Sequence, residues 1–148
     1  MQDNLSQYGH TFQTKVISSL ISDKIFLQQV FDIIDPSYFE SQANSWIVGK
    51  IVSYYEKYKQ PPTSEVFKSE VLAVEDKVLK STITDALKET AKYRESSDSD
   101  YVKNIVLEFC KNQKMKVAIL ESVDLLKSGK YDMIKKKIDN ALKAGGDK

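Results

Sequence analysis

The stretch 101–127, YVKNIVLEFCKNQKMKVAILESVDLLK, decides the fold that we expect for this chain. It contains neither Gly nor Pro, and its apolar residues recur every three or four positions, which is the period of an α-helix. A helix of this length measures about 40 Å at 1.5 Å per residue. Ser128 and Gly129 then supply a left-handed C-terminal cap, and a shorter helical pattern follows over 131–144. The sequence therefore predicts an antiparallel helical hairpin over 101–144.

The chain before this hairpin has the same helical period. Asp23, Pro36 and the pair Pro61 and Pro62 mark helix ends, and Asp23 and Thr63 are suited to cap the helices that follow them. Phe39, just after the Pro36 turn, is expected to enter the core. We therefore expect an all-α fold in which a compact five-helix globular subdomain precedes the long hairpin. The expected division is a flexible N-terminus at 1–9, the globular subdomain at 10–95 with helices over 12–22, 24–34, 42–59, 64–71 and 75–94, a polar joint at 96–100, the hairpin at 101–144 and the start of a linker at 145–148.

Charge is balanced overall but unevenly distributed. The 148 residues contain 22 Lys and Arg against 21 Asp and Glu, for a net charge of +1. Such a small charge does not steer a protein onto nucleic acid or an anionic membrane. Residues 1–101 carry eleven basic and fifteen acidic side chains, a net of −4, and 102–148 carry eleven and six, a net of +5. Arg94 is the only arginine, which disfavours base reading by a guanidinium fork.

No group of residues points to catalysis or to a bound cofactor. A phosphate loop of the form GxxxxGKS or GxxxxGKT is absent, and His10 is the only histidine and lies near the N-terminus. Cys110 has no histidine near it in sequence, so we interpret it as a small buried apolar residue. The pattern at Asp98 and Asp100 lacks the glycine of a calcium loop and has Phe109 at the glutamate position. We therefore expect no catalytic residue, no cofactor and no metal.

The location of the chain follows from what its composition lacks. A single cysteine, together with the absence of an apolar leader or a long apolar run, predicts a cytoplasmic protein without a membrane segment. The lysines at 135–137 form a basic face that we interpret as solvated, because arginine and stacking aromatic residues are missing there. Direct nucleic-acid binding is therefore expected to be weak or absent.

The hairpin carries more apolar residues than the seam between its two helices can cover. The five-helix subdomain is one candidate cover, and a second copy of the chain, through an isologous interface, is the other. We favour the second copy, because a helix of about 40 Å extends beyond a core of about ninety residues. The residues expected at the seam or at this interface are Tyr101, Val102, Ile105, Val106, Phe109, Val117, Leu120, Ile134 and Ile138.

The order of these segments resembles the N-terminal domain of DnaB-type replicative DNA helicases, most of all the phage-encoded members. The resemblance rests on FQTKVISSLISD at 12–23, FDIIDPSYF at 31–39, the PPT turn at 61–63, EFCKNQ at 108–113 and LKSGKYDMI at 126–134. It extends over about 10–144 and depends on helix pattern and turn residues.

This resemblance implies a non-catalytic collar. Hairpins of two subunits pair in that family, three pairs form the collar of a hexamer, and the collar docks primase and helicase loader proteins during DNA replication. An ATP-dependent motor domain follows the linker. Two alternatives stay open: the helicase-binding domain of a primase, which resembles this domain, and a stand-alone lysine-rich nucleic-acid-binding module.

Overall fold

The computed structural model describes residues 4–146, and the regular structure within this range is helical throughout. The predicted all-α class is confirmed. Within residues 4–146, two short 3-10 helices and seven α-helices follow one another, with bounds η1 Leu5–Tyr8, α1 His10–Ser22, α2 Lys24–Val30, η2 Pro36–Tyr38, α3 Gln42–Tyr58, α4 Ser64–Leu72, α5 Lys77–Ala91, α6 Ser99–Lys127 and α7 Tyr131–Lys143.

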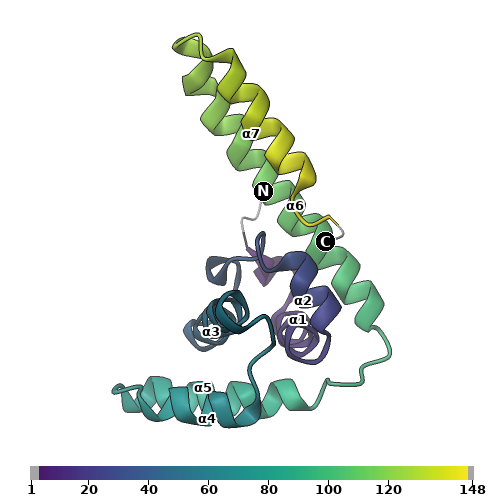
Figure 1. Ribbon diagram of the computed structural model, residues 1–148. Helices are drawn as coiled ribbons and strands as arrows, with labels where there is room; N and C mark the ends of the chain where they lie inside the picture. Colours follow the sequence, from purple (N-terminus) through teal and green to yellow (C-terminus); the bar gives the residue numbers. More distant parts are fainter. Residues whose placement is uncertain (1–3, 147–148) are drawn as a thin grey trace.

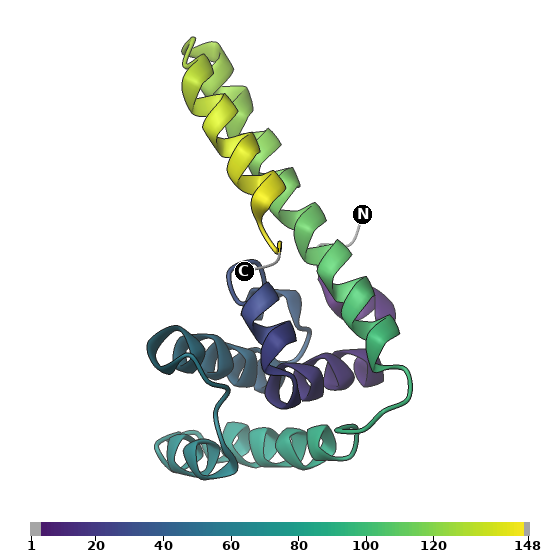
Figure 2. The same ribbon diagram turned by 45° about the vertical axis from the view of Figure 1, so that its right-hand side comes forward.

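The helices form a body with one projecting arm (Figure 1). α1 and α3 lie above a layer made by α4 and α5, and α5 contacts both α1 and α3. The first part of α6 packs on α1, and its second part leaves the body with α7 antiparallel beside it. Figure 2 shows the same projection after a turn of 45°. The outer part of the arm therefore has neighbours only within the hairpin.

Side-chain caps set where several helices begin. Asp23 Oδ1 accepts a hydrogen bond from the Phe26 N–H at 3.1 Å, and Thr63 Oγ1 accepts one from the Val66 N–H at 3.3 Å, so both predicted caps are confirmed. Asp76 accepts from the Leu79 N–H at 3.0 Å, which makes it the cap of α5. For this reason α5 begins at Lys77 rather than at residue 75.

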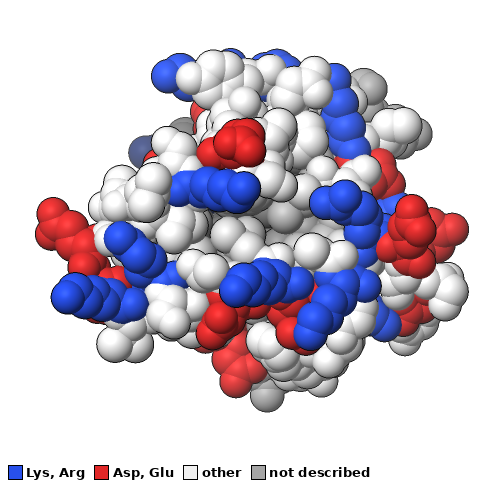
Figure 3. Space-filling model, turned by 90° about the horizontal axis from the view of Figure 1, so that it is seen from below, with Lys and Arg blue, Asp and Glu red and all other residues white. Residues whose placement is uncertain are grey.

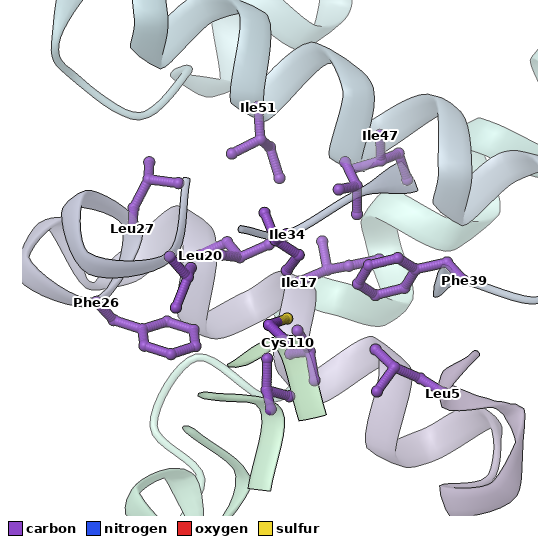
Figure 4. Packing of buried hydrophobic residues seen from close by; sticks show 14 of the residues in the cluster. Leu5, Ile17, Leu20, Phe26, Leu27, Ile34, Phe39, Ile47, Ile51 and Cys110 are labelled. Carbon is purple, nitrogen blue, oxygen red and sulfur yellow. The ribbon is translucent and has the colours of Figure 1, made fainter. Parts of the chain in front are cut away.

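The core lies where α1, α2, α3 and the start of α6 meet (Figure 4). Ile17, Leu20, Ile47 and Ile51 are completely buried, and Phe39 enters the core as predicted. Burial of one such side chain contributes about 1.5–3 kcal/mol of transfer free energy. The apolar stripes of these helices thus explain the arrangement of the body.

Both ends of the described range pack on this core. Leu5, inside the segment expected to be flexible, is completely buried, and η1 contacts α1. Residues 1–3 of that segment lie outside the described residues. At the other end, the expected linker begins with Gly145, which is buried and whose carbonyl accepts a hydrogen bond from Gln29 Nε2 at 3.2 Å. Residues 147–148 also lie outside the described range.

Gly145 is a position where a side chain does not fit. Its φ of +73° is left-handed, and an added Cβ would lie 2.6 Å from Ile33 Cδ1 and 3.3 Å from Leu107 Cδ1. We expect Gly145→Ala to lower the free energy of unfolding by about 2–3 kcal/mol, because it displaces core side chains in addition to straining the backbone. Gly129→Ala is the matched control, because Gly129 has a φ of +68° but open space around it, and we expect it to cost about 1 kcal/mol. Urea unfolding measures both variants, and equal losses would show that packing at Gly145 contributes nothing.

Two ion pairs hold the start of α6 against α1 and α2. Lys15 Nζ lies 2.7 Å from Asp98 Oδ2, and Lys103 pairs with Asp23. Hydrogen bonds from Lys15 and Ser96 lower the pKa of Asp98. Burial raises the pKa of Asp23, but hydrogen bonds from Lys103 and the Phe26 N–H together outweigh it and leave that pKa below 3.8. Both carboxylates therefore favour the folded state while they are ionised.

These pairs predict a loss of stability in acid. A carboxyl group whose pKa is lower in the folded state stabilises the fold above its unfolded pKa, and this contribution disappears as the pH falls through the folded pKa. The combined variant Asp23→Asn and Asp98→Asn should therefore lower the urea midpoint at pH 7 and change it little at pH 2. Asn retains the helix cap at residue 23, so the charge alone is tested. An equal loss at both pH values would exclude the ion pairs as its cause.

Candidate protein interaction surface

The nine predicted interface residues lie in different parts of the structure. Val102, Val106 and Phe109 belong to the core, with exposed fractions of 1%, 0% and 6%. The Phe109 ring lies 5.2 Å from the Tyr38 ring of η2. The first half of α6 packs on α1, which covers these side chains within one chain. The prediction that they form the hairpin seam or a face for a second copy is therefore wrong.

The seam between α6 and α7 uses other residues of α6. Ile134 and Ile138 of α7 are half-buried, and on α6 the residue Ala118 is buried between the two helices. The sequence analysis missed Ala118, although a small residue in the middle of a long helix is a signal of close packing. One edge of the seam is closed by Lys137 Nζ, which lies 2.6 Å from Glu121 Oε2.

The opposite edge of the hairpin is apolar and exposed. Ile119, Val123 and Leu126 are spaced by four and three residues, so they form one stripe on α6, and Leu120 lies beside it. Their exposed fractions are 52% for Ile119, 59% for Leu120, 48% for Val123 and 60% for Leu126. We call these four residues the hairpin face. Of the predicted set, Leu120 belongs to it, and Tyr101 and Val117 are exposed elsewhere on α6.

The helical period places two α7 residues next to this face. Glu121 is two residues from both Ile119 and Val123, which turns it about 200° away from them around α6. The Lys137–Glu121 pair therefore marks the edge opposite the hairpin face. Tyr131 and Leu142 lie on the side of α7 away from Lys137, and they are 67% and 68% exposed. The apolar surface thus extends over both helices.

The hairpin face continues toward the body as a groove of about 690 Å³ between η1 and α6. Ile105, another residue of the predicted set, lines this groove together with Tyr8, Met115 and Ile119. The polar residues Gln7, Glu108, Asn112, Gln113 and Lys116 also line the groove, so apolar surface extends from it to the outer half of the arm with polar side chains between. Exposed apolar surface of this kind is typical of a protein interaction site.

The described residues contain no arrangement suited to metal binding. Between residues 4 and 146, groups of three or more His, Cys, Asp or Glu side chains that could hold a metal ion are absent. The same part of the chain has no helix that combines the length and the apolar character needed to cross a membrane. Of the two acidic residues that were compared with a calcium loop, Asp98 forms an ion pair with Lys15.

Cys110 is completely buried in the core, as the sequence analysis predicted (Figure 4). Burial raises the pKa of its thiol from 9.0 to about 12. At pH 8 the thiolate fraction is then about a thousandfold lower than that of an ordinary cysteine. We expect no reaction with iodoacetamide in the folded chain within hours and complete reaction in urea, measured by mass spectrometry. Fast labelling of the folded chain would contradict this burial.

The basic side of the hairpin is partly neutralised by its own neighbours. Lys135 Nζ lies 2.8 Å from Asp139 Oδ2, and Lys137 binds Glu121. The hydrogen bond from Lys135 lowers the pKa of Asp139, so this pair stays ionised in neutral solution. Two of the three lysines at 135–137 therefore have an acidic partner.

The molecule thus combines a packed helical body with a projecting hairpin whose outer face is apolar. Exposed apolar surface of this kind is typical of protein interaction sites, and it identifies no individual family by itself. Protein-family models, curated proteins and solved structures contain no match to this chain.

Proposed function

We propose that this chain is the non-catalytic N-terminal collar domain of a replicative DNA helicase. In this proposal 10–95 form the globular five-helix subdomain and 101–144 the hairpin, and a motor domain follows in the same polypeptide. Paired hairpins mediate hexamer assembly, and the collar docks primase or a helicase loader during DNA replication. The protein then acts in the cytoplasm, which for a phage-encoded member is that of the host.

The exposed hairpin face is the observation that carries this proposal. Four large apolar side chains lie about half-exposed on the arm, and of these Ile119 and Leu120 also line the groove beside η1. In an isologous pair each copy contributes the same face, so each of these side chains is buried once in each copy. The resemblance at 12–23, 31–39 and 126–134 adds the biological setting.

The size of this face predicts a weak pair. Completing the burial of a half-exposed apolar side chain contributes about 1 kcal/mol. Four residues of the hairpin face with Tyr131 and Leu142, counted in two copies, therefore supply about 12 kcal/mol. Association costs about 4–15 kcal/mol in lost freedom of motion. Two isolated chains should thus form a dimer at high micromolar concentration, and a hexamer would depend on several such contacts at once.

Self-association is the direct test. Sedimentation velocity or native mass spectrometry should show a monomer at about 1 μM and a growing dimer fraction toward about 1 mM. A chain that stays monomeric up to about 1 mM would overturn assembly through the hairpin.

The replication role has a separate test in the gene. An open reading frame that continues past Lys148 into a phosphate loop would support the helicase. A primase core upstream would instead assign the chain as the helicase-binding domain of a primase. A nucleic-acid-binding module would show DNA binding that weakens steeply with added salt, and no binding at low salt would remove this alternative.

A further inference from the structure

A second groove lies on the body, at the end of the molecule remote from the hairpin tip (Figure 1). Its volume is about 720 Å³, and its walls come from α4 and α5, with the end of α1 closing one side. The apolar lining consists mainly of Phe67, Val71 and Leu72 from α4, Leu87 and Ala91 from α5, and Ile21 from α1. We call it the α4–α5 groove.

The groove is a channel with room for a third helix beside α4 and α5. The α5 residues that line it are 80, 84, 87, 88, 90 and 91, a stripe about 17 Å long, and Arg94 continues this wall in the turn after α5. The α4 residues at 64, 67, 68, 71 and 72 form a second stripe. Leu72 is 75% exposed even though it lines the groove. Two apolar stripes that face a common open channel are the arrangement into which an amphipathic helix packs.

The charged side chains that line the groove are all basic, and one of them, Lys68, has Glu65 Oε1 at 3.9 Å from its Nζ. Lys68, Lys80, Lys88 and Arg94 line it, and none of its lining residues is acidic. Figure 3 shows this end of the molecule, where basic side chains, with acidic ones among them, lie around uncharged surface. Residues 1–101 are otherwise net acidic, so the basic rim departs from the charge of its surroundings. Arg94 is the only arginine of the chain, and its guanidinium suits a carboxylate partner.

We propose that the α4–α5 groove binds an acidic amphipathic helix of about four turns from a partner protein. Its apolar side would pack on Phe67 and Leu87, and its Asp or Glu side chains would meet Lys80, Lys88 and Arg94. Lys80 and Lys88 are eight residues apart on α5, and Arg94 lies in the turn after it, so the three cations are spread along the groove. A fatty acid has one carboxylate at one end and matches this distribution less well.

The proposal deepens the docking role of the proposed function by naming the chemistry of the partner. The groove and the hairpin face are different surfaces, so each can fail alone. Peptide binding can be measured on the full chain carrying Ile119→Asp and Val123→Asp, where self-association does not interfere.

Fluorescence anisotropy with three designed peptides tests the groove. The first is a labelled 16-residue helix with Leu and Phe at i, i+3, i+4 and i+7 and Glu elsewhere. The second has the same composition in scrambled order, and the third has Lys in place of Glu. At low salt we expect the first to bind in the micromolar range and at least about tenfold more tightly than either control.

Matched variants locate the binding. The pair Lys88→Glu and Arg94→Glu removes two exposed groove cations and should weaken the acidic peptide at least about tenfold. The pair Lys77→Glu and Lys92→Glu makes the same charge change on exposed positions of α5 and its C-cap outside the groove, and should weaken it less than about threefold.

Two substitutions of apolar residues test how much the apolar contacts contribute to peptide binding. Leu72→Ser in the groove should weaken binding about fivefold, and Val78→Ser, equally exposed but outside the groove, should not. Circular dichroism verifies that all variants are folded. Equal binding of the ordered and scrambled peptides, no binding up to about 1 mM, or equal effects of groove and control variants would each overturn the proposal. Decanoate binding in the groove without peptide binding would assign it to a fatty acid and also overturn it.

Discussion

The combined variant Ile119→Asp and Val123→Asp is expected to be monomeric at every concentration at which the unsubstituted chain dimerises. Both residues belong to the hairpin face and are about half-exposed, so the single chain accommodates the carboxylates in water. In an isologous pair, four carboxylates would be buried against apolar surface without a partner, which costs several kcal/mol. We expect the dissociation constant to rise at least about a hundredfold, measured by sedimentation velocity.

Met133→Asp is the matched control for this experiment. Met133 is 48% exposed, like Val123, but it lies one turn before Lys137, on the edge that the Lys137–Glu121 pair closes. It should leave self-association within about threefold of the unsubstituted chain. If Met133→Asp abolished dimerisation and the double variant did not, the opposite edge of the hairpin would be the interface.

Val106→Asp is expected to unfold the chain. Val106 is completely buried in the core, where a carboxylate would be removed from water. The loss of the apolar side chain and the burial of a charge together cost at least about 4 kcal/mol. Since domains of this size have about 5–15 kcal/mol of stability, most of it would be lost. Circular dichroism in urea measures the effect.

Val117→Asp makes the same substitution eleven residues later on the same helix. Val117 is 49% exposed, so the free energy of unfolding should change by less than about 0.5 kcal/mol. A Val106→Asp chain with an unchanged urea midpoint would show that α6 does not pack on the body through this residue. The comparison separates the part of α6 that holds the fold from the part that is free to bind.

Local signals in the sequence located the seven α-helices, although α2 ends at Val30 rather than at 34, α5 ends at Ala91 rather than at 94, and α6 begins at Ser99 rather than at 101. Asp23 and Thr63 cap the helices that follow them, and Gly129 has the left-handed φ that ends α6. These features depend on residues within one helical turn of each other, so their chemistry is readable from the chain alone. The same holds for the long helix, which has no Gly or Pro along 101–127.

The candidate site was only partly predictable. Leu120 is exposed on the hairpin face, whereas Phe109 is buried in the core, although both line the groove together with Ile105. All three follow the same helical period of apolar residues on α6. This period predicts an apolar stripe along the helix but not which of its residues are buried. Which stretch of the stripe is covered depends on where α1 ends and the arm leaves the body.

The sequence by itself determined that this chain is helical, where most of its helices end, and that its long helix carries more apolar residues than one seam can cover. Only the tertiary structure decided which of those residues are covered, that Leu5 and Gly145 pack on the core, and that Lys68 and Arg94 line one groove. The physical reason is the distance along the chain over which each kind of interaction acts. Helix formation and capping act between residues a few positions apart, whereas burial and grooves arise between segments whose distance in space the local pattern does not contain.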